Sequence, residues 1–439
     1  MKNISKYLFL FVAAIVASSC DDYLDVKPVG KVIPETLVDF RAVLTRGYST
    51  FPLHKSLTAL RTDEMILEEE SNDLAFYKDN YIWNDANPDR ISTKFPYAGL
   101  YNCIFYTNVI INEASGKLEA SAEKDQLIGE AYALRALAYF DLVNLFGKQY
   151  NAATASSDTG VPLALKIDLE QAYIPESVAV IYAQIHSDKE AAKKLLNLDT
   201  QAKGLNYRFS KAALYTMESR VYLYQKQWAL ALEATEKGLA INNALVDLNT
   251  TPILPNNYDT KESIMALEIT FENKIRRSAY VAPTLTDVYD QTNDLRFNLY
   301  YQKSGSQLIF KKGGELNQKN TFRTSELYLT KAEASVQLND LATARTTLLN
   351  FIKNRYNTTG FAQLSTKIGA MNQTELLDFV YQERQREFSI EGQRWFDLRR
   401  TTQKQIEHTI GGKTYTLIQN DPRYTLPFPL DARLNNPEL

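Results

Sequence analysis

Apolar residues recur with the period of an α-helix along most of the chain. A helix that begins after the capping residue Ser210 would carry four of them on one face: Leu214, Met217, Val221 and Tyr224. Such a stripe is stable only when it is buried against another element. This periodicity restricts the chain to folds in which helices pack against one another.

Two segments look like antiparallel helix pairs of one design. In each, a short polar link precedes a bulky residue and, three positions later, an alanine: Trp228 with Ala231, and Leu341 with Ala344. Small residues at this spacing let two helices approach closely, as in tetratricopeptide repeats. The two units lie 113 residues apart, which is not a whole number of repeats of about 34 residues, so the array must be interrupted.

Other stripes and the segments between them give the expected organisation. One stripe ends at Gly147, another helix begins after Ser177, and Gly411 with Gly412 suggests a hairpin. The predicted fold class is all-α, a tetratricopeptide-like helical superhelix with irregular, loop-rich excursions. The expected parts are a signal peptide over 1–19 and a single domain over 20–439, with a scaffold at about 95–245 and 321–400, excursions at about 49–94 and 246–320, and a tail at 401–439.

Charge and metal-ligand content exclude several classes of protein. Lysine and arginine number 49 against 52 aspartates and glutamates, a formal net charge of −3, and no basic run is present. Nucleic acid is therefore not an expected partner. The two cysteines, Cys20 and Cys103, and three widely separated histidines match no disulfide framework and no metal-binding spacing. We expect no cofactor and no metal.

The first twenty residues have the form of an export signal. Lys2 and Lys6 precede an apolar run over 7–16, and small residues lead to Cys20. A cysteine at this point resembles the lipobox of bacterial lipoproteins, in which cleavage precedes the cysteine and lipid is attached to it. We expect the mature chain to be anchored to a membrane through Cys20 without crossing it, because no other segment is long and apolar enough to span.

The densest charged segment lies over 381–400. Glu383, Glu387 and Glu391 are four residues apart, so they could share a helical face, and paired carboxylates could hydrolyse a glycoside. Arginines interleave with them, however, and a neighbouring arginine keeps a carboxylate ionised, which works against a general acid. We therefore favour helix-surface ion pairs and an arginine–carboxylate network, with the helix ending at Gly392.

Aromatic residues point to a binding surface around Trp83. Tyr77, Tyr81 and Trp83 alternate in a polar stretch, and in an extended chain they would point the same way. Flat rings bordered by Asp79 and Asn84 suit sugar rings, and they would equally suit an extended peptide. The alternative interpretation is a loop folded onto its own aromatic residues.

A second aromatic-rich excursion runs from Tyr280 to position 301. It could supply an opposing wall, with Tyr280 and Tyr289 as candidate contacts. If ligand stacks on Trp83 and Tyr81, then Trp83→Ala should weaken ligand binding and leave thermal unfolding nearly unchanged.

Seven segments in order resemble the SusD/RagB family of nutrient-binding outer-membrane lipoproteins. They are CDDYLDVKP (20–28), WNDANPDRISTKFPYAGLYNCIFYTNVII (83–111), EAYALRALAYFDLVNLFG (130–147), SKAALYTMESRVYLYQKQWALAL (210–232), SELYLTKAEASVQLNDLATARTTLLN (325–350), ERQREFSIEGQRWFDLRR (383–400) and LPFPLDARLNNPEL (426–439). The segment at 383–400 is the most specific of them. The resemblance covers almost the whole chain after the signal segment.

The resemblance implies a tetratricopeptide-like superhelix that supports an irregular ligand-binding face, with Trp83 at the position of the family's ligand-stacking tryptophan. It also implies a partner, a SusC-type TonB-dependent transporter in the outer membrane, on which the lipoprotein acts as a lid facing the exterior. The expected function is non-catalytic binding of oligosaccharide or peptide and its delivery to that transporter. A glycoside hydrolase and a helical assembly scaffold without a small ligand are the alternatives.

Overall fold

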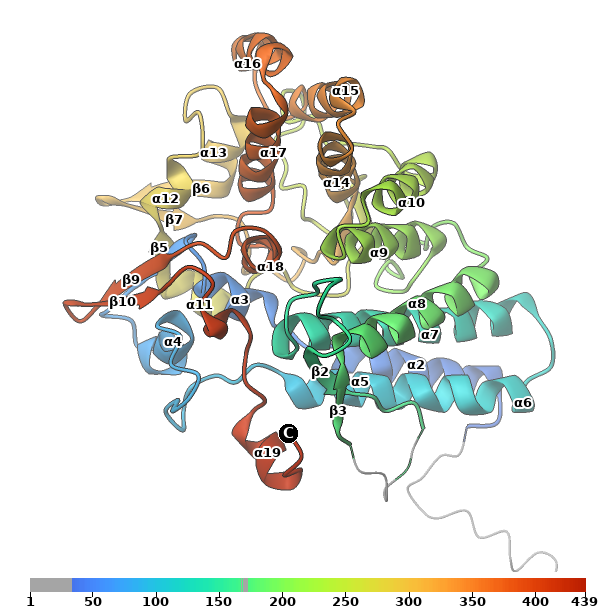
Figure 1. Ribbon diagram of the computed structural model, residues 1–439. Coiled ribbons are helices and arrows are strands. Elements are labelled where there is room, and N and C mark those ends of the chain that lie inside the picture. Colours follow the sequence, from blue (N-terminus) through green and yellow to red (C-terminus); the bar gives the residue numbers. More distant parts are fainter. Residues whose placement is uncertain (1–33, 167, 169–172) are drawn as a thin grey trace, which may run out of the picture.

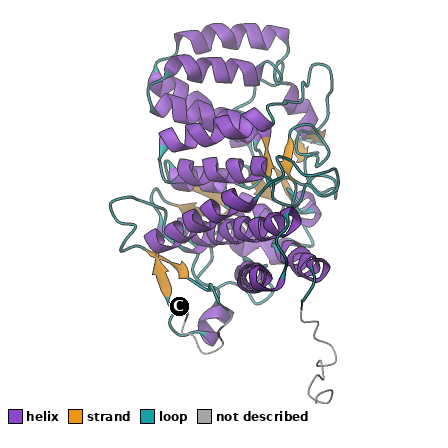
Figure 2. Ribbon diagram, turned by 90° about the vertical axis from the view of Figure 1, so that its right-hand side faces the viewer, coloured by secondary structure: helices purple, strands orange, loops and turns teal. Residues whose placement is uncertain are grey.

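The computed structural model describes residues 34–166, 168 and 173–439. The predicted signal segment and Cys20 lie outside the described residues. Within them, the dominant feature is a stack of helices (Figures 1 and 2). Its members are α2 (Leu37–Thr50), α5 (Tyr97–Val109), α7 (Ala122–Phe146), α8 (Val178–Leu195), α9 (Lys211–Tyr224), α10 (Trp228–Ile241), α14 (Thr324–Gln337), α15 (Leu341–Ile352), α16 (Thr358–Ala370) and α17 (Gln373–Glu387).

Neighbouring helices in the stack pack in sequence order, α7 on α8, α9 on α10, α10 on α14 and α14 on α15. The predicted helical fold class is confirmed. Ala231 and Ala344 are fully buried, as the repeat design required. Gly238 allows still closer approach, because a Cβ there would lie 2.9 Å from a methyl group of Leu327 on α14.

The predicted helix ends are also confirmed. The Ser210 and Ser177 side chains accept hydrogen bonds from the first turns of α9 and α8, and α7 ends at Gly147. Asn339 adopts the left-handed conformation (φ 60°) between α14 and α15, and Asp340 caps α15.

Short elements fill the connections. Helical ones are α3 (Lys55–Leu60), α4 (Leu74–Tyr81), α6 (Ser115–Lys117), α11 (Asn273–Arg277), α12 (Pro283–Thr286), α13 (Leu295–Tyr300), α18 (Gln393–Arg400), α19 (Leu430–Asn435), the π-helix Ile110–Ala114 and the 3-10 turn Pro422–Tyr424.

Strands within the described residues form antiparallel pairs. These pairs are β1 (Met65–Leu67) with β5 (Ala279–Val281), β2 (Thr159–Pro162) with β3 (Pro175–Ser177), β4 (Ser263–Met265) with β8 (Phe322–Arg323), β6 (Tyr301–Ser304) with β7 (Gln307–Phe310), and β9 (Ile406–Ile410) with β10 (Lys413–Leu417). The last pair is the hairpin predicted at Gly411 and Gly412.

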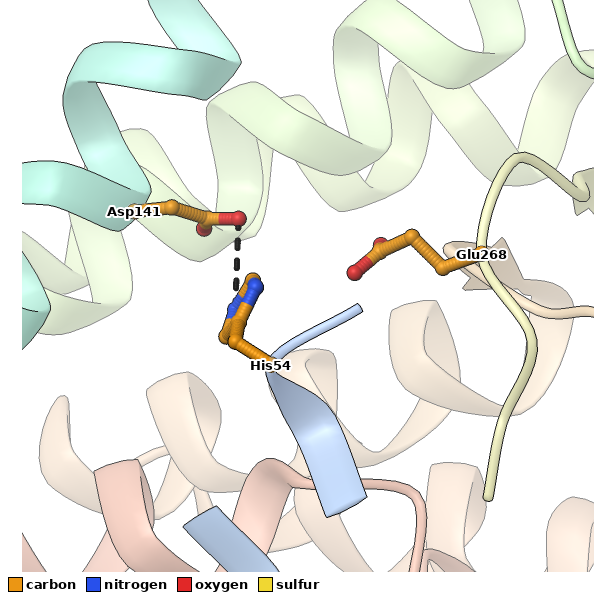
Figure 3. Close-up of side chains that lie close together, drawn as sticks. All are labelled: His54, Asp141 and Glu268. Carbon is orange, nitrogen blue, oxygen red and sulfur yellow. Dashed lines mark ion pairs between the residues drawn. The ribbon is translucent and has the colours of Figure 1, made fainter. Parts of the chain in front are cut away.

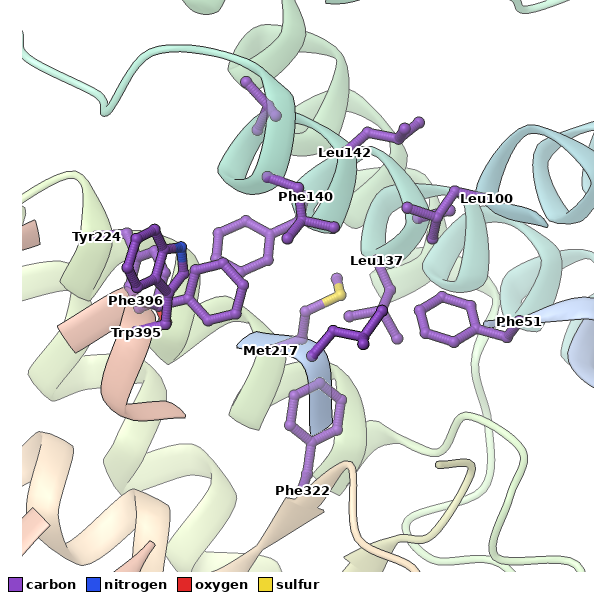
Figure 4. Close-up of a cluster of buried hydrophobic side chains, with 14 of the residues drawn as sticks. Phe51, Leu100, Leu137, Phe140, Leu142, Met217, Tyr224, Phe322, Trp395 and Phe396 are labelled. Atoms are coloured by element: carbon purple, nitrogen blue, oxygen red, sulfur yellow. The ribbon is translucent and has the colours of Figure 1, made fainter. Parts of the chain in front are cut away.

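The main apolar core lies between the helical stack and the short elements. Figure 4 shows Leu137 and Phe140 of α7 and Met217 of α9 meeting Phe322 of β8 and Phe396 of α18. Residues near both ends of the chain therefore share one core.

The prediction that a helix ends at Gly392 is wrong, because α17 already ends at Glu387 and Gly392 precedes α18. Its φ of 76° lies in the left-handed region, and a Cβ there would come within 2.8 Å of the Lys55 backbone. Glycine is required at this position by close contact with α3 as well as by backbone conformation.

The charged segment 381–400 is buried. Glu383, Glu387 and Glu391 are almost inaccessible. Burial alone would raise the pKa of each carboxyl, but facing arginines lower it below its ordinary value and keep the group ionised. An arginine–carboxylate network is thus present, but the prediction that it lies on a helix surface is wrong. Carboxylates held ionised in this way cannot supply the general acid that a glycosidase needs.

The network centres on Glu387 and joins distant segments. Arg296 of α13 and Arg355, which follows α15, donate to it at 3.0 and 2.9 Å, and Arg323 of β8 donates to its other oxygen. Arg355 also donates to Glu262 at 2.7 Å. Each buried charge therefore has opposite charges as neighbours, which is the condition for removing it from water.

Glu387→Gln should lower the free energy of unfolding by about 3–5 kcal/mol, because it leaves buried guanidinium groups without their shared counter-charge. Chemical denaturation measures this loss. The control is Glu233→Gln, the same change in an exposed ion pair with Lys237, which should cost less than about 0.5 kcal/mol. Equal losses in the two variants would contradict a structural role for the network.

Candidate functional site

A cleft of about 820 Å³ opens beside Trp83. The turn after α4, the loop between α7 and β2, and the C-terminal segment from position 420 onward form most of it, and Gln403 adds one more side chain. Its polar lining includes the carboxamides Asn84, Gln149, Asn151, Gln403 and Asn420, the carboxylates Asp85, Asp158 and Asp421, the cations Lys148, Arg423 and Arg433, and the hydroxyl residues Thr154, Tyr424 and Thr425. These groups offer hydrogen-bond donors and acceptors at many angles, as hydroxyl-rich ligands require.

A second hollow of about 530 Å³ adjoins the cleft. Asn84, Asp85 and Arg433 line both, so the two hollows meet at the turn after α4 and at the C-terminal segment.

The predicted aromatic platform is not exposed. Residues 74–81 form helix α4 rather than an extended strand, which places Tyr77 and Tyr81 one turn apart with both rings buried. Trp83 follows the helix in the left-handed conformation (φ 54°) and is only 2% exposed. The prediction that these three rings point together toward a ligand is therefore wrong, and the alternative, a loop folded onto its own aromatic residues, describes the segment.

The rings of Tyr81 and Trp83 both stack on one imidazole ring, that of His408. The His408 ring lies 3.9 Å from the Tyr81 ring and 4.3 Å from the Trp83 ring, nearly parallel to both. The Trp83 indole N–H donates to the carbonyl of Arg61 at 3.1 Å. This stack attaches the β9–β10 hairpin to α4 and forms rigid support under the cleft.

A second stack supports the other side of the cleft. The Arg61 guanidinium lies 4.9 Å from the Trp395 ring, which stacks on Tyr424 at 4.9 Å. Arg61 also holds Asp85 through two hydrogen bonds of 2.7 and 2.8 Å and donates to the Arg423 carbonyl. Two lining segments are thereby fixed by one buried cation.

Asp79 and Asn84 organise the turn between them. Asp79 accepts hydrogen bonds from the Asn84 amide at 2.8 Å, from the Asp89 backbone at 2.6 Å and from the Ser92 hydroxyl. Partial burial raises the pKa of Asp79, but the hydrogen bonds from Ser92 and Asn84 outweigh it and lower the pKa below its ordinary value. Asn84 remains in the cleft, while Asp79 faces only the adjoining hollow.

Tyr280 and Tyr289 do not line the cleft. Tyr280 lies in β5 opposite Ile66, and its hydroxyl donates to Glu68. Tyr289 is buried and donates to the Arg386 carbonyl at 2.6 Å. The predicted opposing wall is instead made mostly by polar residues of the 148–158 loop and the C-terminal segment.

Two carboxylates in the cleft, Asp158 and Asp421, are held in their ionised form. The Thr154 hydroxyl lowers the pKa of Asp158, and the Arg423 guanidinium lowers the pKa of Asp421. Two carboxyl groups with the opposite shift lie in the interior, where burial raises the pKa of Glu64 to about 8 and that of Asp141 to about 6. Neither of these lines the cleft.

Comparison with known proteins identifies the family. Residues 22–223 match a SusD-like family model described as starch-binding and associating with the outer membrane, and residues 188–437 match the model of the SusD family. The chain belongs to the SusD family. The resemblance found in the sequence is confirmed. In the part of the chain that the structure describes, each helix is too short or too polar to cross a bilayer.

Relatives cover nearly the whole chain. SusD-like protein P38 of Formosa agariphila is 26% identical over 534 residues, covering 100% of this chain and 98% of that protein. A SusD superfamily protein from Bacteroides fragilis has a TM-score of 0.78 at 21% identity, covering 93% of this chain and 100% of that one. A laminarin binding SusD-like protein has a TM-score of 0.59 at 19% identity, covering 83% and 91%. The structural matches show a shared fold.

Trp83→Ala should lower the free energy of unfolding by about 3–5 kcal/mol, because the indole fills space under the cleft. Thermal or chemical denaturation tests this outcome, which is the reverse of the one expected from the sequence. Phe76→Ala on the same helix α4 is the control, since that ring is 40% exposed and should cost about 1 kcal/mol or less. A Trp83→Ala variant as stable as the control would refute the supporting role.

Glu64→Gln should stabilise the protein increasingly as the pH rises from 5 to 8. The folded pKa of about 8 lies above the ordinary value of 4.5, so the folded state binds the proton more tightly and loses relative stability as the unfolded state ionises. Glutamine does not titrate, and its advantage should reach up to about 4 kcal/mol near pH 8. Melting curves across this range measure it, and a constant difference would contradict a neutral Glu64.

Proposed function

We propose that this protein binds oligosaccharide in the cleft beside Trp83 and delivers it, uncleaved, to a SusC-like TonB-dependent transporter in the outer membrane. The observation that carries the proposal is the lining of the cleft, where carboxamides, ionised carboxylates and arginines converge over a rigid aromatic support. Sugar hydroxyls both donate and accept hydrogen bonds, so such a mixed lining suits them.

The shared lining of the two hollows favours a chain-like ligand. Asn84 and Arg433 face both hollows, so adjacent units of an oligosaccharide could contact the same residues from either side. The laminarin binding relative makes a glucan the first ligand to try. A peptide remains the other candidate ligand, since its backbone also offers donors and acceptors in alternation.

Electrostatics support a role without catalysis. A glycosidase requires one carboxyl group with a raised pKa beside the scissile bond. Asp158 and Asp421 of the cleft have lowered pKa values, and the buried Glu64 and Asp141 are out of reach of a ligand in the cleft. These carboxylates are suited to binding and releasing a ligand and not to cleaving it.

The proposals of a lipid anchor and of a transporter partner are based on the sequence resemblance. A lipid on Cys20 would hold the mature chain at the outer membrane with its folded part outside, where it could cover the mouth of the transporter. Several weak hydrogen bonds in an open cleft give micromolar to millimolar affinity, which is compatible with handing the ligand on.

Combining Arg433→Ala with Asn151→Ala should weaken oligosaccharide binding about tenfold, because two hydrogen-bonding groups of about 0.5–1.5 kcal/mol each are lost from the cleft. Isothermal titration with laminarin and starch oligosaccharides, and with peptides, measures the affinity. Both side chains are exposed, so the melting temperature should stay unchanged.

Arg46→Ala on α2, an exposed arginine outside the cleft lining, is the matched control. Unchanged sugar affinity in the double variant would show that the cleft is not the sugar-binding site. Binding of peptides alone would show that the ligand is a peptide and not an oligosaccharide. Release of new reducing ends from the glycans would favour the glycoside hydrolase, and binding of the transporter without any small ligand would favour the scaffold.

A further inference from the structure

Three side chains that are far apart in the sequence meet inside the protein. His54 precedes α3, Asp141 belongs to α7, and Glu268 lies in the segment after β4. One possible ligand atom of each lies within 4.8 Å of those of the other two. Figure 3 shows the Glu268 carboxylate pointing toward the His54 ring and Asp141 joined to that ring by an ion pair. All three residues are buried, and none lines the cleft.

One possible ligand atom of this cluster has unmet bonding capacity. Glu268 Oε1 is buried without a hydrogen-bond partner among the described residues, and Glu268 is only 2% exposed. The far ring nitrogen of His54, Nδ1, also lacks a partner there, and an ion bound at Nε2 would leave it so. A buried polar atom without a partner costs free energy, and in native proteins it commonly marks an ion or ordered water. A cavity of about 20 Å³ is lined by His54, Asp141 and Glu268, and this is room for about one water molecule.

The spacing of the first two ligand atoms suits a tetrahedral metal ion. His54 Nε2 and Asp141 Oδ2 are 3.4 Å apart, which is longer than an ordinary N–H···O hydrogen bond. Two ligands at about 2.0–2.2 Å from a zinc ion are about 3.4 Å apart when the ion is tetrahedral. A small inward movement of the Glu268 side chain would complete the third position.

Neighbouring cations leave the free oxygen of Glu268 available. Lys55 Nζ lies 3.0 Å from Glu268 Oε2 and donates to the Asn320 carbonyl at 2.7 Å. Arg220, which also lines the cavity, is held by two hydrogen bonds to Glu326. Neither cation occupies Glu268 Oε1, and Lys55 balances only one of the two buried carboxylates.

We propose that His54, Asp141 and Glu268 form a buried zinc-binding site and supply its three protein ligands. An imidazole and two carboxylates are a donor set that zinc accepts. Calcium is a poorer fit, because it requires six to eight oxygen ligands and the cavity has room for about one water. The ion would tie α3 and α7 to the segment after β4, and its role would be structural.

Zinc binding to the full-length protein, purified in detergent without a histidine tag and treated with a chelator, tests the site. Isothermal titration with Zn²⁺ should give one equivalent bound, and the melting temperature should rise by a few degrees in excess Zn²⁺. His54→Gln should lose both effects. His186→Gln is the matched control, since His186 is half-buried on α8 outside the cluster and its replacement should leave both effects intact.

X-ray absorption of the zinc-loaded wild-type protein gives a second measurement that needs no variant. It should show only nitrogen and oxygen ligands at about 2.0–2.2 Å. Absence of zinc uptake by the wild-type protein would overturn the proposal in favour of a water molecule beside a His54–Asp141 ion pair. Equal uptake by wild type and a folded His54→Gln variant, or a sulfur ligand, would overturn it in favour of adventitious zinc elsewhere. These zinc experiments do not measure sugar binding, so none of their outcomes affects the proposed function.

Discussion

The carboxylate of Glu387, surrounded by three guanidinium groups, is the interaction on which the rest of the structure depends. Its partners come from α13, β8 and the end of α15, so no local segment can satisfy it. A buried arginine is tolerated only when its counter-charge is already in place. These elements must therefore meet in one arrangement, and alternative packings of the same apolar faces would leave charges unpaired.

Helix α18 connects the cleft to the helical stack. Arg400 on that helix binds Glu333 of α14 with bonds of 2.5 and 2.8 Å, and Trp395 stacks on Tyr424. Arg399 donates to the Tyr424 carbonyl at 2.9 Å. The C-terminal segment that lines the cleft is thus fixed to the helical stack by side chains of a single helix. A cleft whose walls are fixed in advance loses little conformational entropy when a ligand binds.

Sequence reasoning succeeded where the signal is local. Caps such as Ser177 and Ser210, the Gly411 hairpin and the helical stripes depend on residues a few positions apart, and the structure confirms them. The placement of Trp83 failed because alternation was read as an extended chain, although Tyr77 and Tyr81 also fit one helical face. Burial of the indole is decided by His408, more than three hundred residues away. The grouping of His54, Asp141 and Glu268 had no sequence signal for the same reason.

A cleft without an exposed aromatic platform has consequences for recognition. Stacking on a ring is tolerant of ligand identity, whereas hydrogen bonds to buried or fixed polar groups discriminate by the position of each hydroxyl. Asp85 is fixed by Arg61 and Asp421 is held by Arg423, so their orientations cannot adapt to a different pattern. Under the proposed function, selectivity in this cleft would therefore depend on which sugar hydroxyls match these fixed oxygens. The buried rings contribute by keeping those oxygens in place.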